Sequence, residues 1–342
     1  MRRKKYNTFL KKLNQAKNPL FFFDDDPDGL AAFLLCYRQV KRGHGIVVKS
    51  TPIVKAGMLK KIDEHNADAV FVLDLAKLDP GFVDGSKVPI AWVDHHEPAI
   101  FENVFYINPR LEDSEAYIPV SWIIYEALKS DLWIATVGTL GDFAIPSFIG
   151  EFKKQYPGYI NNEKTPEELL FKTKLGNLVR VFSFILKGPT RQVMSCVKVL
   201  TRIQHPDEIM NKATSQGRFI YKYYEKYLKH YNELLQKALN SYRKDDTLLV
   251  FVYPSSKISM TADLALELIY RFPDKLVIVA REKNNEMKIS IRSRGIKLTK
   301  LLDRALKGVN GYGGGHEYAV GANVKKQDFK KFIKQLRMNL EK

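Results

Sequence analysis

Residues 21–30 read FFFDDDPDGL, an aromatic run followed directly by four acidic side chains, a proline and a glycine. The aromatic run predicts a buried strand, and we expect a helix to begin where it ends. The two-residue period of a strand places Asp24, Asp26 and Asp28 on one side and turns Asp25 away. Three crowded carboxylates repel one another unless a cation lies between them. Gly29 allows a tight turn into the helix, so this segment predicts a metal site at a strand end.

The surrounding sequence alternates short apolar runs with helix-like segments as far as residue 143. Alternation of this kind favours a mostly parallel sheet covered on both faces, which binds ligands beyond the carboxyl ends of its strands. The expected strands are 20–23, 45–49, 69–75, 90–94 and 104–108. The expected helices are 29–40, 56–65, 119–129 and 131–141.

Further acids stand where other apolar segments end. Asp74 closes one predicted strand, Asp94 with His95 and His96 closes another, and Asp142 follows Gly141 after an apolar helix-like stretch. Parallel strands would bring these groups to the Asp26 and Asp28 segment. Carboxylates with an imidazole suit Mn²⁺ or Mg²⁺ better than zinc, which prefers thiolates. The acids suffice for two ions, an arrangement that can clamp a phosphoryl group.

The rest of the chain predicts two further parts. Residues 151–244 carry long amphipathic stretches and are expected to form a helical connector after an N-terminal domain of residues 1–150. Strands return at 247–253, 275–281 and 286–293, with a helix at 261–271, so residues 245–342 form a smaller α/β domain. In its last strand Ile289 and Ile291 face inward, while Lys288, Ser290 and Arg292 face the other way.

The charge of the chain is large and unevenly placed. Its 342 residues have a formal net charge of +17 and are 45% hydrophobic. Residues 1–150 contain 18 basic and 19 acidic residues, so the remainder carries 37 and 19, a net of +18. Such polarisation indicates a polyanionic partner, most often nucleic acid, although a lysine-rich thermophile-like surface is an alternative. No apolar run has the length of a membrane span. The lack of a secretory signal and the two isolated cysteines favour a reduced cytoplasm.

Six motifs in order give the chain a resemblance to a known family. Four of them resemble the motifs of the DHH phosphoesterase superfamily: residues 26–29 (DPDG), Asp74, residues 94–96 (DHH) and residues 141–142 (GD). Residues 290–293 (SIRS) and 313–316 (GGGH) resemble the associated C-terminal substrate-binding domain. The pattern is most similar to RecJ-like and nanoRNase-like proteins, especially the compact archaeal ones.

The resemblance implies roles for the matched residues. Asp26 and Asp28 would each hold one of two Mn²⁺ ions, with Mg²⁺ as the alternative, and Asp74 would bridge them. The remaining roles concern the other ligands and the phosphate: His95 and Asp142 would complete the metal ligands, His96 would contact the scissile phosphate, and Asp94 would orient its neighbours. The substrate would be held by Ser290, Arg292, Ser293 and a glycine-rich loop formed by Gly313, Gly314, Gly315 and His316.

One position separates branches of this superfamily. The pyrophosphatase-like and nanoRNase-like branches carry a histidine four residues before the position of Asp26, where this chain has Phe22. The RecJ branch has an aspartate two residues before it, which Asp24 matches. Asp24 is therefore a further expected metal ligand, and the nuclease branch is favoured.

These observations predict a metal-dependent exonuclease or oligonucleotidase that hydrolyses single-stranded RNA or DNA with a water activated between two metals. A phosphodiesterase for a cyclic or linear dinucleotide is an alternative, although it needs far less positive surface. A non-catalytic scaffold in a replication or RNA-processing complex is a third hypothesis, and the intact ligand set argues against it. A homodimer or a replication or RNA-processing partner stays open.

Overall fold

The aromatic run forms strand β1 (Pro19–Asp24) in the computed structural model, which describes residues 2–49, 51–254 and 258–340. Leu20 and Phe22 pack into a cluster on one face of the sheet. Phe21 and Phe23 point to the other face and contact the ring of Phe33 in helix α2 (Pro27–Val40). All four strand side chains are fully buried. Because apolar side chains point to both faces of the sheet, both faces must be covered by helices.

The five predicted strands form one parallel sheet in the order β2-β1-β4-β6-β7. Its other strands are β2 (His44–Val48), β4 (Ala69–Leu73), β6 (Ile90–Val93) and β7 (Val104–Ile107). A small parallel pair, β3 (Ile53–Val54) and β5 (Lys77–Leu78), lies outside it. The expectation of a parallel N-terminal sheet is confirmed.

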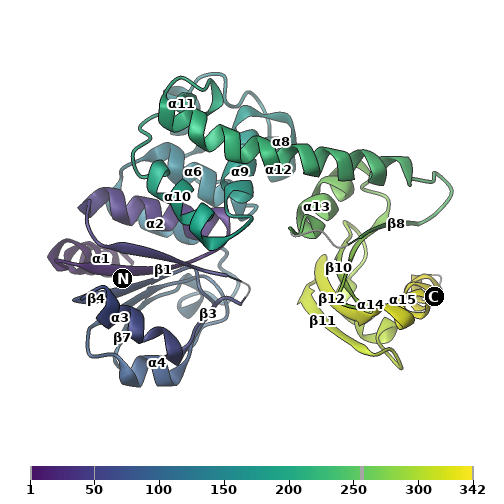
Figure 1. The fold of residues 1–342 in the computed structure, drawn as a ribbon, viewed down its shortest axis with the longest axis horizontal. Coiled ribbons are helices and arrows are strands. Elements are labelled where there is room, and N and C mark those ends of the chain that lie inside the picture. The colour runs from purple at the N-terminus through teal and green to yellow at the C-terminus, as the bar shows by residue number, and fades with distance from the viewer. Residues whose placement is uncertain (1, 50, 255–257, 341–342) are drawn as a thin grey trace. The chain divides into compact units, whose positions relative to one another are not determined.

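The helices of this region cover the two faces of the sheet, with α2 on one side and α3 and α4 on the other (Figure 1). They are α1 (Arg2–Gln15), α3 (Lys60–Glu64), α4 (Pro80–Gly85), α5 (Val120–Leu128) and α6 (Leu132–Gly141). The helix expected over 56–65 is broken into a 3-10 turn, Ala56–Met58, followed by α3. The expectation of one continuous helix there is wrong: Gly57, the second residue of the stretch, disfavours a helix and lies in the 3-10 turn.

A helical layer follows, and the chain divides into the compact units Met1–Tyr224 and Glu225–Lys342. The layer consists of α7 (Ile149–Gln155), α8 (Pro166–Lys172), α9 (Lys174–Ile185), α10 (Thr190–Leu200), α11 (Asp207–Met210) and α12 (Ser215–Asn240). Residues 151–224, part of the expected connector, belong to the first unit, and α12 contributes to both units. In the described ranges no helix has the length and apolarity needed to cross a bilayer.

The second unit is built on a sheet in the order β11-β12-β10-β9-β8. Its strands are β8 (Leu248–Tyr253), β9 (Leu276–Lys283), β10 (Glu286–Arg292), β11 (Gly311–His316) and β12 (Ala319–Lys325). β8 and β9 are parallel, and the other pairs are antiparallel. Helix α13 (Thr261–Arg271) packs on β9 and β10, whereas α14 (Leu298–Ala305) and α15 (Phe329–Leu340) join the core formed by Ile289 and Ile291.

The glycine-rich segment 313–315 lies inside strand β11, so the expectation of a loop is wrong. Glycine is disfavoured in strands, which made a loop the natural reading. Pairing with β12 satisfies the backbone groups of this segment and overrides the local preference.

Candidate active site

The acidic segment lies at the junction of β1 and α2. Asp24 ends the strand, and Asp26 caps the helix by accepting a hydrogen bond from Gly29 N at 2.9 Å. Asp28 lies in the first helical turn, and Asp25 is exposed. A Cβ at position 29 would lie 2.7 Å from Asp24 N, so only glycine lets the helix approach the strand this closely. Asp25 is separated from the other three acids, as expected. The cause differs from the expected one, because the strand ends at Asp24 and its two-residue period does not extend to Asp26 and Asp28.

Asp28 is held by the start of helix α5, far away in the sequence. Its carboxylate, with no exposed surface, accepts hydrogen bonds from Val120 N at 2.6 Å and Ser121 N at 2.9 Å. The hydroxyl of Ser121 is a third donor. Amides at a helix start carry partial positive charge and favour an anion there. Sequence reasoning missed Ser121, because no local pattern links residues so far apart.

Asp74 follows β4 and has an unusual backbone for a residue with a side chain. Its φ is +61°, in the left-handed region that such residues rarely adopt. The residue is 1% exposed, and both carboxylate oxygens lack a hydrogen-bond partner among the described residues. Backbone strain and unsatisfied buried acceptors are both costly, and they gather at functional sites.

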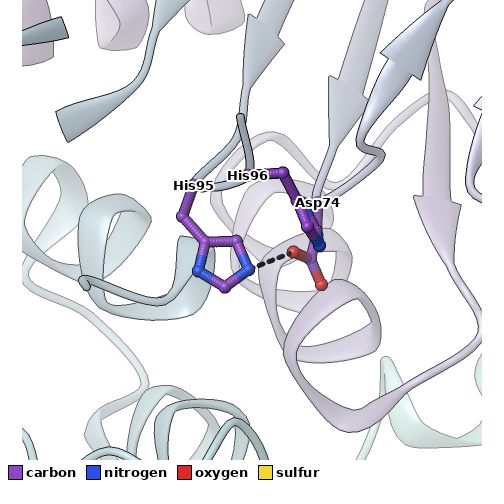
Figure 2. Close-up of side chains that lie close together, drawn as sticks. All are labelled: Asp74, His95 and His96. Carbon is purple, nitrogen blue, oxygen red and sulfur yellow. Dashed lines mark ion pairs between the residues drawn. The ribbon is translucent and has the colours of Figure 1, made fainter. Parts of the chain in front are cut away.

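His95 connects Asp74 with Asp142, which follows α6. Its Nε2 lies 3.3 Å from Asp74 Oδ1 and 3.2 Å from Asp142 Oδ2, and Figure 2 shows the first of these pairs. Tyr117 donates a hydrogen bond from its hydroxyl to the backbone oxygen of Asp142 at 2.8 Å. Tyr117 is a second residue that the sequence did not indicate.

Asp94 orients His96 from a fully buried position after β6. Its Oδ1 lies 2.7 Å from His96 Nδ1, and its Oδ2 accepts a hydrogen bond from His96 N at 3.1 Å. Tyr106 and Asn108, on and after β7, contact the same carboxylate at 3.5 and 3.4 Å. The His96 ring is thereby fixed by an anion behind it.

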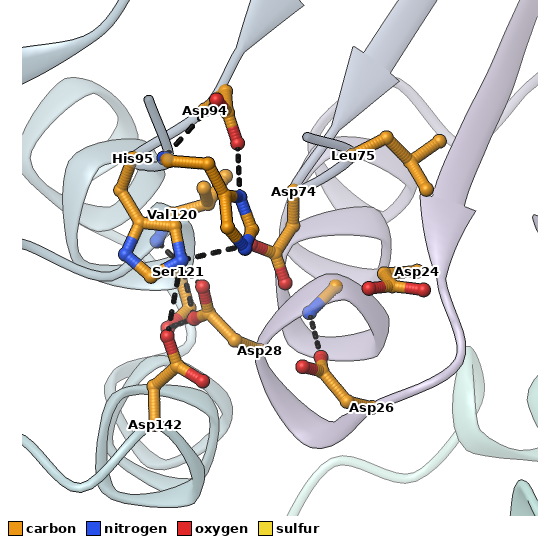
Figure 3. A network of polar contacts seen from close by, with 12 residues as sticks. Asp24, Asp26, Asp28, Asp74, Leu75, Asp94, His95, Val120, Ser121 and Asp142 are labelled. Carbon is orange, nitrogen blue, oxygen red and sulfur yellow. Dashed lines mark hydrogen bonds and ion pairs between the residues drawn. The ribbon is translucent and has the colours of Figure 1, made fainter. Parts of the chain in front are cut away.

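The five acids from β1, α2, β4 and α6 lie around a common space (Figure 3). Burial and the charge of Asp26 raise the pKa of Asp24 to about 7, and the same two causes raise the pKa of Asp28 to about 7. Burial and the neighbouring acids also raise the pKa values of Asp74 and Asp142 well above the ordinary range. Without added positive charge, this cluster cannot be fully ionised at neutral pH.

The pKa of His96 moves in the direction that its neighbours favour. Burial lowers this pKa, but the hydrogen bond and charge of Asp94, with the charges of Asp24 and Asp26, outweigh that effect and raise it. His96 is therefore biased toward the protonated form, in which it can donate to an anion.

The donor set suits divalent cations. Two groups have ligand atoms within 4.8 Å of one another: Asp74, His95 and His96 form one, and Asp28, His95 and Asp142 form the other. Asp24 and Asp26 lie in neither group, although both face the same space. The unsatisfied oxygens of Asp74 and the repelling carboxylates are what a pair of cations would stabilise.

The other predicted residues lie in the second unit, where a groove of about 520 Å³ runs beside α13 over β10, β12 and β11. Ser290, Arg292, Gly313 and Gly314 line it; Ser293, Gly315 and His316 are not among the lining residues. The Arg292 guanidinium donates to the backbone oxygen of Ile291 at 2.9 Å, and burial lowers its pKa. The hydroxyl of Ser293 accepts from Ile296 N at 2.9 Å, which stabilises a turn.

A comparison with models of protein families identifies the domain type of most of the second unit. Residues 248–342 match the DHHA1 domain. Residues 248–342 therefore form a DHHA1 domain. No curated protein sequence matches the chain.

Over nearly its whole length the chain has the fold of solved RecJ structures and of a solved DHH domain. RecJ with Mn²⁺ from Thermus thermophilus is 16% identical with a TM-score of 0.68, covering 99% of this chain and 54% of that one. An exonuclease RecJ bound to manganese is also 16% identical with a TM-score of 0.62, covering 98% and 93%. The pGpG-specific phosphodiesterase PggH from Vibrio cholerae is 13% identical with a TM-score of 0.51, covering 95% and 99%. The chain spans about half the length of the Thermus RecJ.

Proposed function

We propose that this DHH protein is a divalent-metal-dependent phosphodiesterase that hydrolyses single-stranded RNA or DNA, or short oligonucleotides. The observation that carries the proposal is Asp74, a buried carboxylate in a cluster of raised-pKa acids. Neither of its oxygens accepts a hydrogen bond from the described residues, although Oδ1 lies 3.3 Å from His95 Nε2. A purely structural carboxylate would be satisfied by donors, as Asp28 is in part. Mn²⁺ or Mg²⁺ fits these oxygen and imidazole ligands.

The chain's own residues would act on a bound phosphodiester in defined ways. His96, fixed by Asp94 and biased toward protonation, would donate a hydrogen bond to a phosphate oxygen. The amides of Val120 and Ser121 keep Asp28 oriented toward the shared space. When bound, two divalent cations supply positive charge beside the phosphate and lower the pKa of a water that can attack it.

The deciding experiment uses RNA and DNA of two to thirty nucleotides, labelled at either end and incubated with Mn²⁺ or Mg²⁺ and the full chain. We expect stepwise shortening from one end that requires the metal and stops with a chelator. The control is Asp74→Asn, which keeps the side-chain volume but removes one ligand charge. Absence of cleavage of every substrate with both metals would contradict the proposal.

A dinucleotide phosphodiesterase is the second candidate, because the fold also resembles that of PggH, which is named as specific for pGpG. The two candidates differ in their dependence on salt. An enzyme that holds several phosphates loses affinity steeply as salt rises, with a log–log slope of about −0.7 per neutralised phosphate of a single strand. Efficient dinucleotide turnover with a shallow slope would favour the second candidate.

The same assay addresses a scaffold role and the proposed site residues. A scaffold would bind partners without metal-dependent turnover, whereas the acid cluster supports catalysis. We further propose that Asp24, Asp26, Asp28, Asp74, His95 and Asp142 form the metal site. Loss of metal binding in single Asn or Ala variants, measured by calorimetry, tests each assignment.

A further inference from the structure

The register of the C-terminal sheet arranges the groove in three transverse rows. Residues directly opposite each other in antiparallel strands share a face of the sheet, and alternate positions along a strand return to that face. The rows on the groove side run across β10, β12 and β11 as Arg292–Ala319–His316, Ser290–Gly321–Gly314 and Lys288–Asn323–Tyr312. The first two rows each contain residues of the SIRS and GGGH motifs. The third row belongs to neither.

The third row has the chemistry of a nucleotide-binding surface. Tyr312 is 72% exposed and stacks on no other ring in the described part of the chain. Its hydroxyl accepts a hydrogen bond from Asn323 Nδ2 at 3.3 Å, and the same nitrogen donates to Glu286 Oε2 at 2.8 Å. Lys288 is exposed and forms no ion pair among the described residues. An aromatic face in the same row as an exposed cation suits a base and its phosphate.

In the middle row, no side chains cover the sheet at Gly314 and Gly321. A Cβ at Gly314 would meet no atom within 4 Å, and one at Gly321 would meet only Ile289 O, at 3.8 Å. The two glycines are cross-strand partners, so their backbones form one open patch. A nucleotide can therefore lie close to the sheet between the first row and the third.

The spacing of the cations indicates more than one phosphate. Lys288 and Arg292 are four residues apart on the same side of β10, which corresponds to about 13 Å along the strand. Side chains stand roughly perpendicular to a sheet, so at this spacing each cation is placed to contact a different phosphate. Beyond Lys288 the next residue on this face, Glu286, pairs with Lys325 at 2.8 Å, so no unpaired cation continues the series there.

We infer that Lys288, Asn323 and Tyr312 form a second nucleotide subsite, adjacent to the one built by the motif residues, in which Tyr312 stacks a base and Lys288 contacts a phosphate. This inference rests on the proposed function and specifies its substrate class. Lys288 and Arg292 are about 13 Å apart along β10, so a substrate that contacts both must be longer than a dinucleotide. The protein would therefore favour oligonucleotides of three or more nucleotides over dinucleotides.

The test compares kcat/KM of the full chain and its variants on substrates of two, three and five nucleotides. We expect Tyr312→Ala and Lys288→Ala each to lower kcat/KM about tenfold on the longer substrates and less than about twofold on the dinucleotide. The matched controls are Tyr318→Ala, whose exposed ring lies outside the groove lining, and Lys300→Ala on α14. Both controls should leave the length preference unchanged.

A binding measurement separates this inference from the proposed function. Fluorescence anisotropy with a labelled pentanucleotide, in a chelator, should show weaker binding for both groove variants and a salt slope about 0.7 smaller for Lys288→Ala. If the wild-type protein cleaves no substrate but the variants still bind the pentanucleotide more weakly than it does, the phosphodiesterase proposal is wrong and the subsite is supported. Equal losses on all lengths, or no loss in either assay, would overturn the subsite.

Discussion

The acid cluster of the first unit and the groove of the second are built on opposite principles. The cluster is buried, collects side chains from five segments between Asp24 and Asp142, and concentrates charge of one sign. The groove is open, comes largely from three neighbouring strands, and presents Lys288 and Arg292 at intervals. Chemistry at a phosphorus atom needs a few groups fixed against one another, whereas holding a chain of phosphates needs spaced cations.

This difference separates what each region controls. A change in the acid cluster should affect turnover and metal binding, because the proposed ligands surround the same small space. A change in the groove should affect substrate affinity and length preference, because each cation of the proposed subsites would contact its own phosphate. The variants below are ordered from the largest expected effect to the smallest.

Asp74→Asn should give the largest loss, at least about a thousandfold in kcat/KM, because it removes a buried ligand charge from the centre of the cluster. The metal-free variant should melt at the same temperature as the wild type or higher, since a repelling carboxylate is gone. Steady-state kinetics and calorimetry in chelator measure both. Asp63→Asn, an exposed acid on α3, is the control. Activity above a tenth of wild type would contradict the assigned role.

Asp94→Asn should lower kcat/KM about a hundredfold while leaving the metal titration midpoint unchanged, because Asp94 acts through His96. Loss of the anion should lower the pKa of His96, so the alkaline limb of the pH profile should move to lower pH. A pH profile of unchanged shape would argue that His96 is not the group that titrates.

Arg292→Ala should raise KM about tenfold, with little change in metal affinity, because the groove and the metal site belong to different units. Arg304→Ala on α14 removes the same charge outside the groove lining and serves as the control. Isothermal titration with Mn²⁺ and steady-state kinetics provide the two readouts. Parallel losses of substrate and metal affinity would break the division between the regions.

Asp24→Asn should have the smallest of these effects, a pH-dependent gain of about 2–4 °C in the melting temperature of the metal-free protein. The folded pKa of Asp24 is raised to about 7, so between its unfolded value and pH 7 the folded state binds more protons than the unfolded state. Stability due to this group is full at low pH and is lost as pH rises toward 7. The variant should therefore gain more at pH 7.5 than at pH 5. An equal gain at both pH values would remove the raised pKa as the cause.

Sequence patterns predicted the elements of the fold because the apolar periods of helices and of strands are local properties of the chain. Apolar runs marked every strand of the parallel sheet, and alternation in β10 placed Ile289 inward and Arg292 outward. Local preference failed where pairing dominates: the glycines of β11 are held in a strand by β12. It also failed for Ser121 and Tyr117, whose contacts with Asp28 and Asp142 are 93 and 25 residues away in sequence.

The sequence by itself determined which side chains could bind cations and phosphates, because acids at strand ends and cations on alternate strand positions follow from chain periodicity. Only the tertiary structure decided how they combine: His95 between Asp74 and Asp142, Asp28 on the amides of α5, and Lys288 in one row with Tyr312. These groups are brought together by strand order and register, which depend on contacts between residues far apart in the chain.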